Sequence, residues 1–203
     1  MVIRHVLAGI GYDIQETILD GHALGALERR NRLCMVAVSK GIEVDLEALQ
    51  PARQREASLA AVLEPHEVVE ARYKAYDYLA AKEARDLSAG KGFRRQLLDG
   101  TEDGVGTIGR GYAKARSTEP FVRHPEDSGL SRLLTKEEHA RVKTVPEMLI
   151  HGLSETVSHE ILGQGVVHCA FRAVGRLLGD CLQRLREQHL KGGLASQAPR
   201  QAA

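Results

Sequence analysis

The hydrophobic pattern is strongest in the last third of the chain, where apolar residues recur at the spacing of a buried helix face. Leu149, Leu153, Val157 and Ile161 repeat every four residues. Beyond Gly165 the pattern resumes with Val167, Phe171, Val174, Leu178, Cys181 and Leu185. This spacing predicts two long helices over 147–190, with a break or kink at Gly163–Gly165.

Weaker helical patterns occupy the first half of the chain. Apolar residues three to five positions apart predict a helix over 12–33, and another over about 65–88 begins at Pro65, where the missing proline N–H costs nothing. Thr135-Lys-Glu-Glu138 has the form of a capping box, which predicts a helix start. Together these elements predict a mainly α fold, a helical bundle that forms one domain over 1–191, followed by a disordered tail over 192–203.

The helical pattern stops between about 89 and 130. This stretch holds eight glycines and two prolines, and it is longer than a typical connection inside a compact domain. We expect an irregular glycine-rich excursion from the bundle. A small β-hairpin around 105–112 and a functional loop are the two arrangements that this composition favours.

Composition and charge narrow the classes of function. With 28 Lys+Arg against 27 Asp+Glu, the chain is not a polybasic coat protein, so any charged site must be a local patch. Three widely spaced cysteines form no close pair, which favours free thiols and a cytoplasmic location. No run of 18 apolar residues is present, so we expect no contact with a membrane interior.

Basic residues cluster in two parts of the chain, and they are the leading candidates for a nucleic-acid-binding surface. These residues are Arg29, Arg30 and Arg32, then Lys91, Arg94, Arg95, Arg110, Lys114 and Arg116. Neighbouring glycines let backbone N–H groups approach an anion, and guanidinium groups bind phosphate with two hydrogen bonds. A solvated, turn-rich loop is the alternative interpretation of the same glycines.

Two shorter motifs point in other directions. The segment over about 33–53 resembles the turn of helix-turn-helix DNA-binding repressors, through Ala37, Gly41 and the apolar residues after Ile42. Pro51 would shorten the second helix of such a motif, and a plain αα-hairpin explains the same residues. Gly104-Val-Gly-Thr-Ile-Gly109 matches a dinucleotide-binding pattern in letters, without the strand and helix that should flank it.

A third motif, Thr107-Ile-Gly-Arg-Gly-Tyr112, resembles a short stretch of phage-type lysozymes, and Leu134–Glu138 resembles a helix start of that family. Tyr112 stands where the family has a histidine, and 87–98 carries no carboxylate where its catalytic glutamate would lie. The resemblance implies a glycoside hydrolase, whose two carboxylates would have to come from 99–103, where Glu102 and Asp103 lie.

A metal site is the other enzymatic interpretation. His151, Glu155 and His159 are four residues apart and would share one face of the predicted helix, as a half-site for Zn or Fe. Three donors along a straight helix span about 12 Å, so at most two could bind one ion, with a third ligand from His139 or His168. A polar helix face without a metal explains the same spacing.

The leading functional prediction is a non-enzymatic binding protein that engages nucleic acid, or a nucleic-acid-processing complex, through its basic clusters. The first alternative is a hydrolase with the His/Glu metal site or lysozyme-like carboxylates. The second is a helical assembly or inhibitor protein that acts through protein–protein contacts. No cofactor is predicted beyond the Zn or Fe of the hydrolase. Gly175 and Gly179 give one helix a smooth face that could bury a second copy of the chain in a homodimer.

Overall fold

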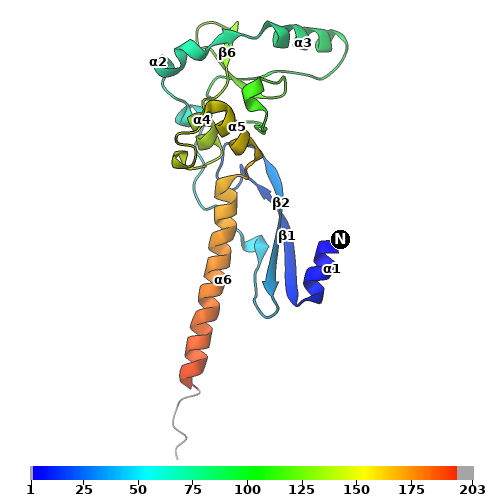
Figure 1. Ribbon diagram of the computed structural model, residues 1–203, viewed down its shortest axis with the longest axis vertical. Coiled ribbons are helices and arrows are strands. Elements are labelled where there is room, and N and C mark those ends of the chain that lie inside the picture. The colour runs from blue at the N-terminus through cyan, green and yellow to red at the C-terminus, as the bar shows by residue number, and fades with distance from the viewer. Residues whose placement is uncertain (1, 196–203) are drawn as a thin grey trace, which may run out of the picture.

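The computed structural model describes residues 2–195, with side chains described through residue 191. The molecule has two parts, which we call the stem and the head (Figure 1). The stem contains the long helix α6 (His168–Ala195), helix α1 (Val2–Gly9) and a two-stranded ribbon. The head contains the remaining helices and a four-stranded sheet.

The ribbon pairs β1 (Tyr12–Asp20) with β2 (Asn31–Ser39) in antiparallel register. Along β2, Cys34 and Val36 are buried whereas Leu33 and Met35 are exposed, which is the two-residue alternation of a strand. The buried side packs against α6 through residues that include Val174 and Cys181. The prediction of a helix over 12–33 is therefore wrong, and so is the helix-turn-helix over 33–53.

Glycines between β1 and β2 allow the chain to turn there. Gly25 has a φ of +107°, a conformation that residues with a Cβ rarely adopt, and it lies directly against the backbone of Arg53. Asp20 closes the start of the turn by accepting a hydrogen bond from the backbone N–H of His22 at 2.9 Å. Gly21 and Gly25 therefore belong to the connection between two strands.

The head sheet has the strand order β3-β6-β5-β4. Its strands are β3 (Lys74–Ala75), β4 (Gln96–Leu98), β5 (Pro120–Arg123) and β6 (Leu130–Arg132), and only the β4–β5 pair is parallel. The predicted glycine-rich excursion thus supplies two strands of a sheet, β4 and β5, and ends where β6 begins. The expected hairpin around 105–112 is absent, since Val105 forms an isolated bridge with Glu28 and Tyr112–Lys114 is a 3-10 turn.

Sheet formation also divides the helix predicted over 65–88. It becomes the single turn α2 (His66–Val69), a 3-10 turn, β3 and then α3 (Asp77–Ser88). Because the described chain forms two sheets as well as helices, the prediction of a mainly α helical bundle is wrong. Pairing between distant segments decided this, and a single-sequence periodicity does not report such pairing.

Two local predictions in the second half are confirmed. Helix α4 (Lys136–Val142) begins with the expected capping box, in which the Thr135 hydroxyl accepts from the Glu138 N–H and the Glu138 carboxylate accepts from the Thr135 N–H. The chain also breaks between α5 (Glu155–Gln164) and α6, at Gly165. The first of the two predicted long helices is shorter than expected, because Glu147–Leu149 is a 3-10 turn.

Among residues 2–195, no helix is both long enough and apolar enough to cross a membrane. Helix α6 continues to Ala195, so the first four residues of the predicted disordered tail are helical. The rest of that tail, 196–203, lies outside the described residues. The single-domain prediction for 1–191 stays a prediction.

Candidate functional site

The candidate site is a hollow in the head, which we call the basic recess. It lies between the loop that carries the 3-10 turn η4 (Tyr112–Lys114) and the first turns of α5. Its lining residues are Arg110, Gly111, Ala113, Lys114, Arg116, Thr156 and Glu160. A neighbouring hollow shares Ala113 and Thr156 with it and adds further cations, Arg72 and Lys74.

The three cations of the basic recess differ in how they are held. Arg110 donates to Glu160 at 2.6 Å in an exposed ion pair. Lys114 and Arg116 are exposed, and neither forms an ion pair within residues 2–195. An exposed pair of this kind contributes little to stability, so all three side chains are available to an anion.

A buried tyrosine fixes the loop that carries these cations. The hydroxyl of Tyr112 donates to the carbonyl of Pro120 at 2.8 Å and accepts from the N–H of Leu134 at 2.8 Å. Burial raises the pKa of Tyr112 far above its usual value, so the hydroxyl stays protonated and keeps both bonds. Its ring packs against the buried imidazoles of His139 and His159. The loop is therefore anchored to α4 and α5.

Close backbone contact holds the other end of the loop. A Cβ on Gly163 of α5 would lie closer than 3.0 Å to the carbonyl of Gly109 and the amide nitrogen of Arg110. A Cβ on Gly111 would similarly meet the guanidinium of Arg116, at 2.6 Å. Glycine at 163 lets α5 and the loop pack backbone to backbone, whereas glycine at 111 leaves room for the Arg116 side chain.

Beneath the loop lies a buried cluster of charges. The carboxylate of Glu28 accepts from the N–H of Ile108 at 2.9 Å, and the ammonium of Lys143 lies 3.3 Å from the same carboxylate. Arg30 donates to the carbonyls of Ile108 and Gly163, at 3.3 and 3.1 Å. Burial lowers the pKa of Lys143, against the attraction of Glu28, which raises it.

This cluster changes the role of Arg30. Only 6% of the residue is exposed, so its guanidinium cannot reach a phosphate, contrary to the prediction that placed it on a binding surface. It instead cross-links the strand connection, the loop and α5. Sequence reasoning could not separate Arg30 from its neighbours, because exposure depends on residues 78 and 133 positions away.

The rest of the N-terminal basic cluster is held by nearby groups. Arg29 is exposed but donates to Asp103 at 2.5 Å. Arg32 is half-buried on β2 and donates to the carbonyl of Asn31 at 2.9 Å. Neither residue lines the basic recess. Of the two predicted clusters, only the second therefore contributes residues to the recess.

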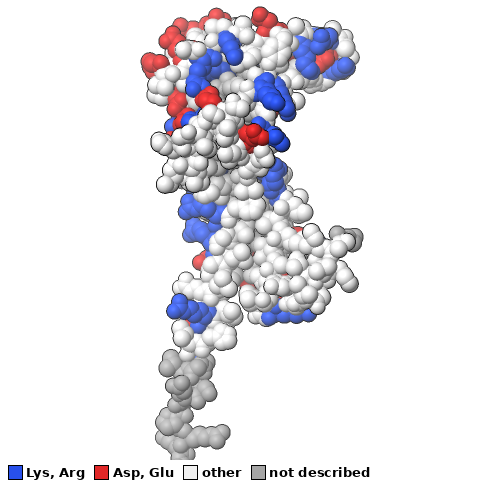
Figure 2. Space-filling view, viewed as in Figure 1, with Lys and Arg blue, Asp and Glu red and all other residues white. Residues whose placement is uncertain are grey.

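Lys91, Arg94 and Arg95 follow α3 at the outer end of the head. Figure 2 shows basic atoms gathered at the free end of α3 and, separately, over the segment that carries η4. Arg95 is half-buried and donates to the hydroxyl of Ser131 at 3.0 Å. The structure thus divides the predicted nucleic-acid-binding residues into several groups.

The predicted metal ligands do not assemble. His151 lies in an exposed turn before α5, whereas His159 is buried, so the expected common helix face does not exist. Glu155 is held by Arg72, which donates at 2.9 Å and lowers the pKa of that carboxyl against the effect of burial. The Nδ1 atom of His159 lies 3.0 Å from Nδ1 of His139. In residues 2–195 no three such side chains could hold a metal ion.

The carboxylates suggested by the lysozyme resemblance are held within turns. Glu102 accepts from the backbone N–H groups of Asp99 and Gly100, both at 3.0 Å, and Asp103 pairs with Arg29. They close local loop geometry and do not face each other across a cleft.

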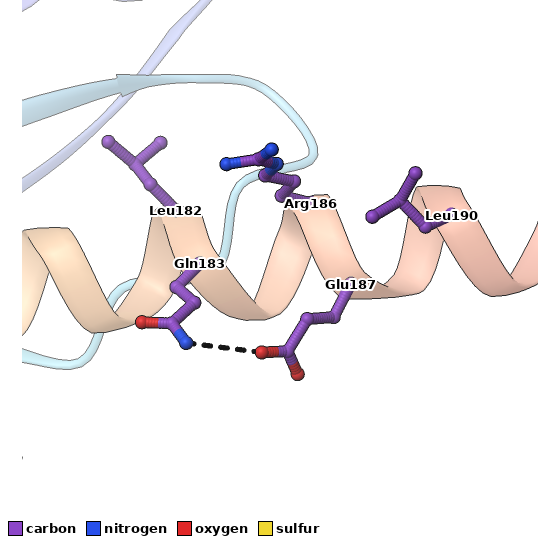
Figure 3. Close-up of a pocket in the computed structure, with 5 residues that line it drawn as sticks. All are labelled: Leu182, Gln183, Arg186, Glu187 and Leu190. Carbon is purple, nitrogen blue, oxygen red and sulfur yellow. Dashed lines mark hydrogen bonds between the residues drawn. The ribbon is translucent and has the colours of Figure 1, made fainter.

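A separate hollow lies on the outer flank of α6, away from the head. Leu182, Gln183, Arg186, Glu187 and Leu190 line it, and Gln183 donates to Glu187 at 3.2 Å (Figure 3). Leu182 and Leu190 are mostly exposed, and a Cβ on Gly175 or Gly179 would meet no atom within 4 Å. The smooth helix face is therefore real, and the homodimer stays a prediction.

Sequence reasoning did not single out Arg72 and Lys74 as binding residues. The sequence predicted a continuous helix over 65–88, whereas the structure places Lys74 in β3 and Arg72 at the end of the 3-10 turn before it, both lining the hollow next to the recess. Their only signal in the sequence was positive charge within an aromatic segment.

No protein-family model and no curated protein sequence matches the chain. The structure is similar to that of the S. pombe Dnmt2 methyltransferase, with a TM-score of 0.71 and 18% identity over 89% of this chain. The Entamoeba histolytica methyltransferase EhMeth gives a TM-score of 0.67 at 18% identity over 89% of this chain. A protein described as a DNA modification methyltransferase, encoded within an E. coli prophage, gives 0.59 at 16% identity over 90%.

The chain spans only part of these structures, namely 61%, 57% and 65% of their respective lengths. The shared fold is one found in methyltransferases, which are enzymes, so the prediction of a non-enzymatic binding protein is wrong. The hydrolase and the helical assembly or inhibitor alternatives do not agree with this fold either.

Proposed function

We propose that this chain is the nucleic-acid-binding part of a methyltransferase and that the basic recess receives the sugar–phosphate backbone. The observation that carries the proposal is the likeness of 89% of the chain to a methyltransferase structure at a TM-score of 0.71. The likeness to a protein described as a DNA modification methyltransferase favours nucleic acid as the substrate class.

The recess has the chemistry that a phosphate backbone requires. Lys114 and Arg116 present free positive charge, and Arg110 shares its charge only with the exposed Glu160. Arg72 and Lys74 extend the basic lining into the adjoining hollow. The loop is fixed by Tyr112 and by the buried charges below it, so little ordering entropy is lost on binding.

The methyl donor does not fit the basic recess. A sulfonium donor is itself a cation, and a recess lined by three cations would repel it. The three cysteines are buried, and burial raises the pKa of Cys34 and Cys169, the opposite of what a nucleophilic thiol needs. We therefore assign substrate binding, and not the chemical step, to the basic recess.

The strength of the expected interaction follows from counterion release. Each phosphate neutralised on a duplex changes the slope of log K against log salt by about −0.9, so one contact is worth roughly eightfold in affinity at 0.1 M relative to 1 M salt. Loss of two contacts should make the slope shallower by about 1.8.

The test uses the variant Lys114→Gln/Arg116→Gln and labelled DNA and RNA hairpins of about 20 base pairs, over about 50 to 200 mM salt. We expect weaker binding and the shallower slope, measured by fluorescence anisotropy. Arg186→Gln/Lys191→Gln, on the far part of α6, removes the same charge and should bind as the unmodified chain does. Equal binding by both variants, or no binding of either hairpin to the unmodified chain, would refute the proposal.

Three finer expectations accompany this function. A cytoplasmic location agrees with the free thiols of all three cysteines. A partner within a nucleic-acid-processing complex stays a prediction, which co-purification with other proteins would test. A homodimer through the exposed face of α6 is testable by the mass of the protein in solution.

A further inference from the structure

We propose that the loop 91–95, at the end of α3, is a second contact for the nucleic-acid backbone, separate from the basic recess. The inference rests on the proposed function, and it adds that the substrate is long enough to touch both places. Lys91 and Arg94 carry the contact. Their sequence neighbourhood, Lys91-Gly-Phe-Arg-Arg95, combines three cations with a glycine and an aromatic ring.

The two cations are free to bind a phosphate. Lys91 and Arg94 are exposed, and within the described part of the chain neither forms an ion pair. The guanidinium of Arg94 donates only to the carbonyl of Phe93, at 3.3 Å. The carboxylates near the loop accept hydrogen bonds from other groups: Asp86 accepts from Lys82 at 2.5 Å, and Glu83 accepts from the backbone N–H of Arg95 at 3.0 Å.

The loop is held in place rather than loosely attached. The N–H of Lys91 donates to the carbonyl of Asp86 at 2.7 Å, which ties the loop to the end of α3. The ammonium of Lys82 lies 3.8 Å from the centre of the Phe93 ring. Arg95 fixes the other end by donating to Ser131 of β6. A fixed loop loses less entropy when it binds, so its two charges act as a formed site.

Helix α3 sets the separation between the loop and the recess. Near its start, the Tyr78 hydroxyl donates to the carbonyl of Ala115 in the recess loop, at 2.6 Å. Ten residues later α3 ends at Ser88, a rise of about 15 Å. Figure 1 shows α3 extending outward along the top of the head, with the loop beyond its far end. A duplex rises about 3.4 Å per base pair, so roughly five base pairs cover this distance.

The test compares hairpins with stems of about 3 base pairs, roughly 10 Å long and too short to reach both places, and of about 20 base pairs, which can reach both. The variant Lys91→Gln/Arg94→Gln should bind the short hairpin as the unmodified chain does. On the long hairpin its slope of log K against log salt should be shallower by about 1.8. Arg186→Gln/Lys191→Gln again serves as the control with the same loss of charge.

The outcomes separate this inference from the proposed function. A variant of the 91–95 loop that binds the long hairpin with unchanged affinity and slope overturns the second contact, while the recess variant still tests the recess. An equal loss of affinity for both hairpins also overturns the second contact, because the loop would then contact the same short stretch of nucleic acid as the recess. Binding of polyglutamate that needs the loop, with unchanged hairpin binding, would show an acidic protein surface as the ligand instead.

Discussion

Replacement of Gly163 by alanine tests whether backbone contact between α5 and the recess loop supports the site. The added Cβ would lie closer than 3.0 Å to three backbone atoms of Gly109 and Arg110, and backbone cannot swing away as a flexible side chain can. Overpacking of this kind is worth about 1–3 kcal/mol, and three backbone clashes favour the upper end. Alanine also favours a helix by about 1 kcal/mol over glycine. The net loss of stability is therefore about 2 kcal/mol.

Gly175→Ala is the matched control, since it makes the same change within a helix where a Cβ meets nothing within 4 Å. It should gain up to about 1 kcal/mol from helix propensity alone. In urea denaturation the two variants should differ by about 3 kcal/mol, and in a thermal scan Gly163→Ala should melt roughly 4–8 °C below the unmodified chain.

The Gly163 substitution should also disturb binding. Because the clash pushes on the backbone of Arg110, affinity for the long hairpin should fall at a temperature where Gly163→Ala is still folded, and Gly175→Ala should leave it unchanged. The reasoning fails if Gly163→Ala is as stable as Gly175→Ala, because the close approach of α5 to the loop would then not hold in solution.

Two further predictions concern the buried charges and histidines beneath the site. Glu28→Gln leaves the buried ammonium of Lys143 without its carboxylate, so the free energy of unfolding measured in urea should fall by about 3–5 kcal/mol. The double variant Glu28→Gln/Lys143→Met should recover part of that stability, and a double variant no more stable than the single one would contradict the ion pair. Burial, with the ring of His159 and the cations Lys143 and Arg30 nearby, holds the pKa of His139 well below 6.5, so the folded state keeps the neutral form that the unfolded chain loses. The free energy of unfolding is therefore highest above pH 6.5 and falls as the pH drops, by up to about 1.4 kcal/mol per pH unit. His139→Gln should make this fall less steep. A free energy of unfolding that does not change between pH 7 and 5 would contradict the lowered pKa of His139.

Local chemistry explains which elements the sequence could predict. The capping box at Thr135 needs only residues three positions apart, and both of its hydrogen bonds form as expected. The end of α5 is also local, because Gly165 follows its last residue and donates its N–H to the carbonyl of Ile161. In each case the interacting groups lie within one helical turn, so their geometry is set before any distant contact forms.

The ribbon shows why the first half was misjudged. Ile18 and Leu19 are adjacent in β1, yet Leu19 is buried and Ile18 is 64% exposed. An exposed apolar residue of this kind blurs a strand pattern and imitates helical spacing. The pairing of β1 with β2 supplies the backbone hydrogen bonds that a helix would otherwise have made, and it joins residues as far apart as Tyr12 and Ser39.

By itself, the sequence determined the charge balance, the helix start at Thr135, the interrupted C-terminal helices and the presence of unusual positive charge in the glycine-rich segment. Only the tertiary structure decided which of those charges are usable. Arg30 became a buried cross-link, Arg29 was paired with Asp103, and Lys114 and Arg116 were left free beside a recess. The physical reason is that a side chain's charge is a local property, whereas its exposure and its partners depend on residues brought close by folding.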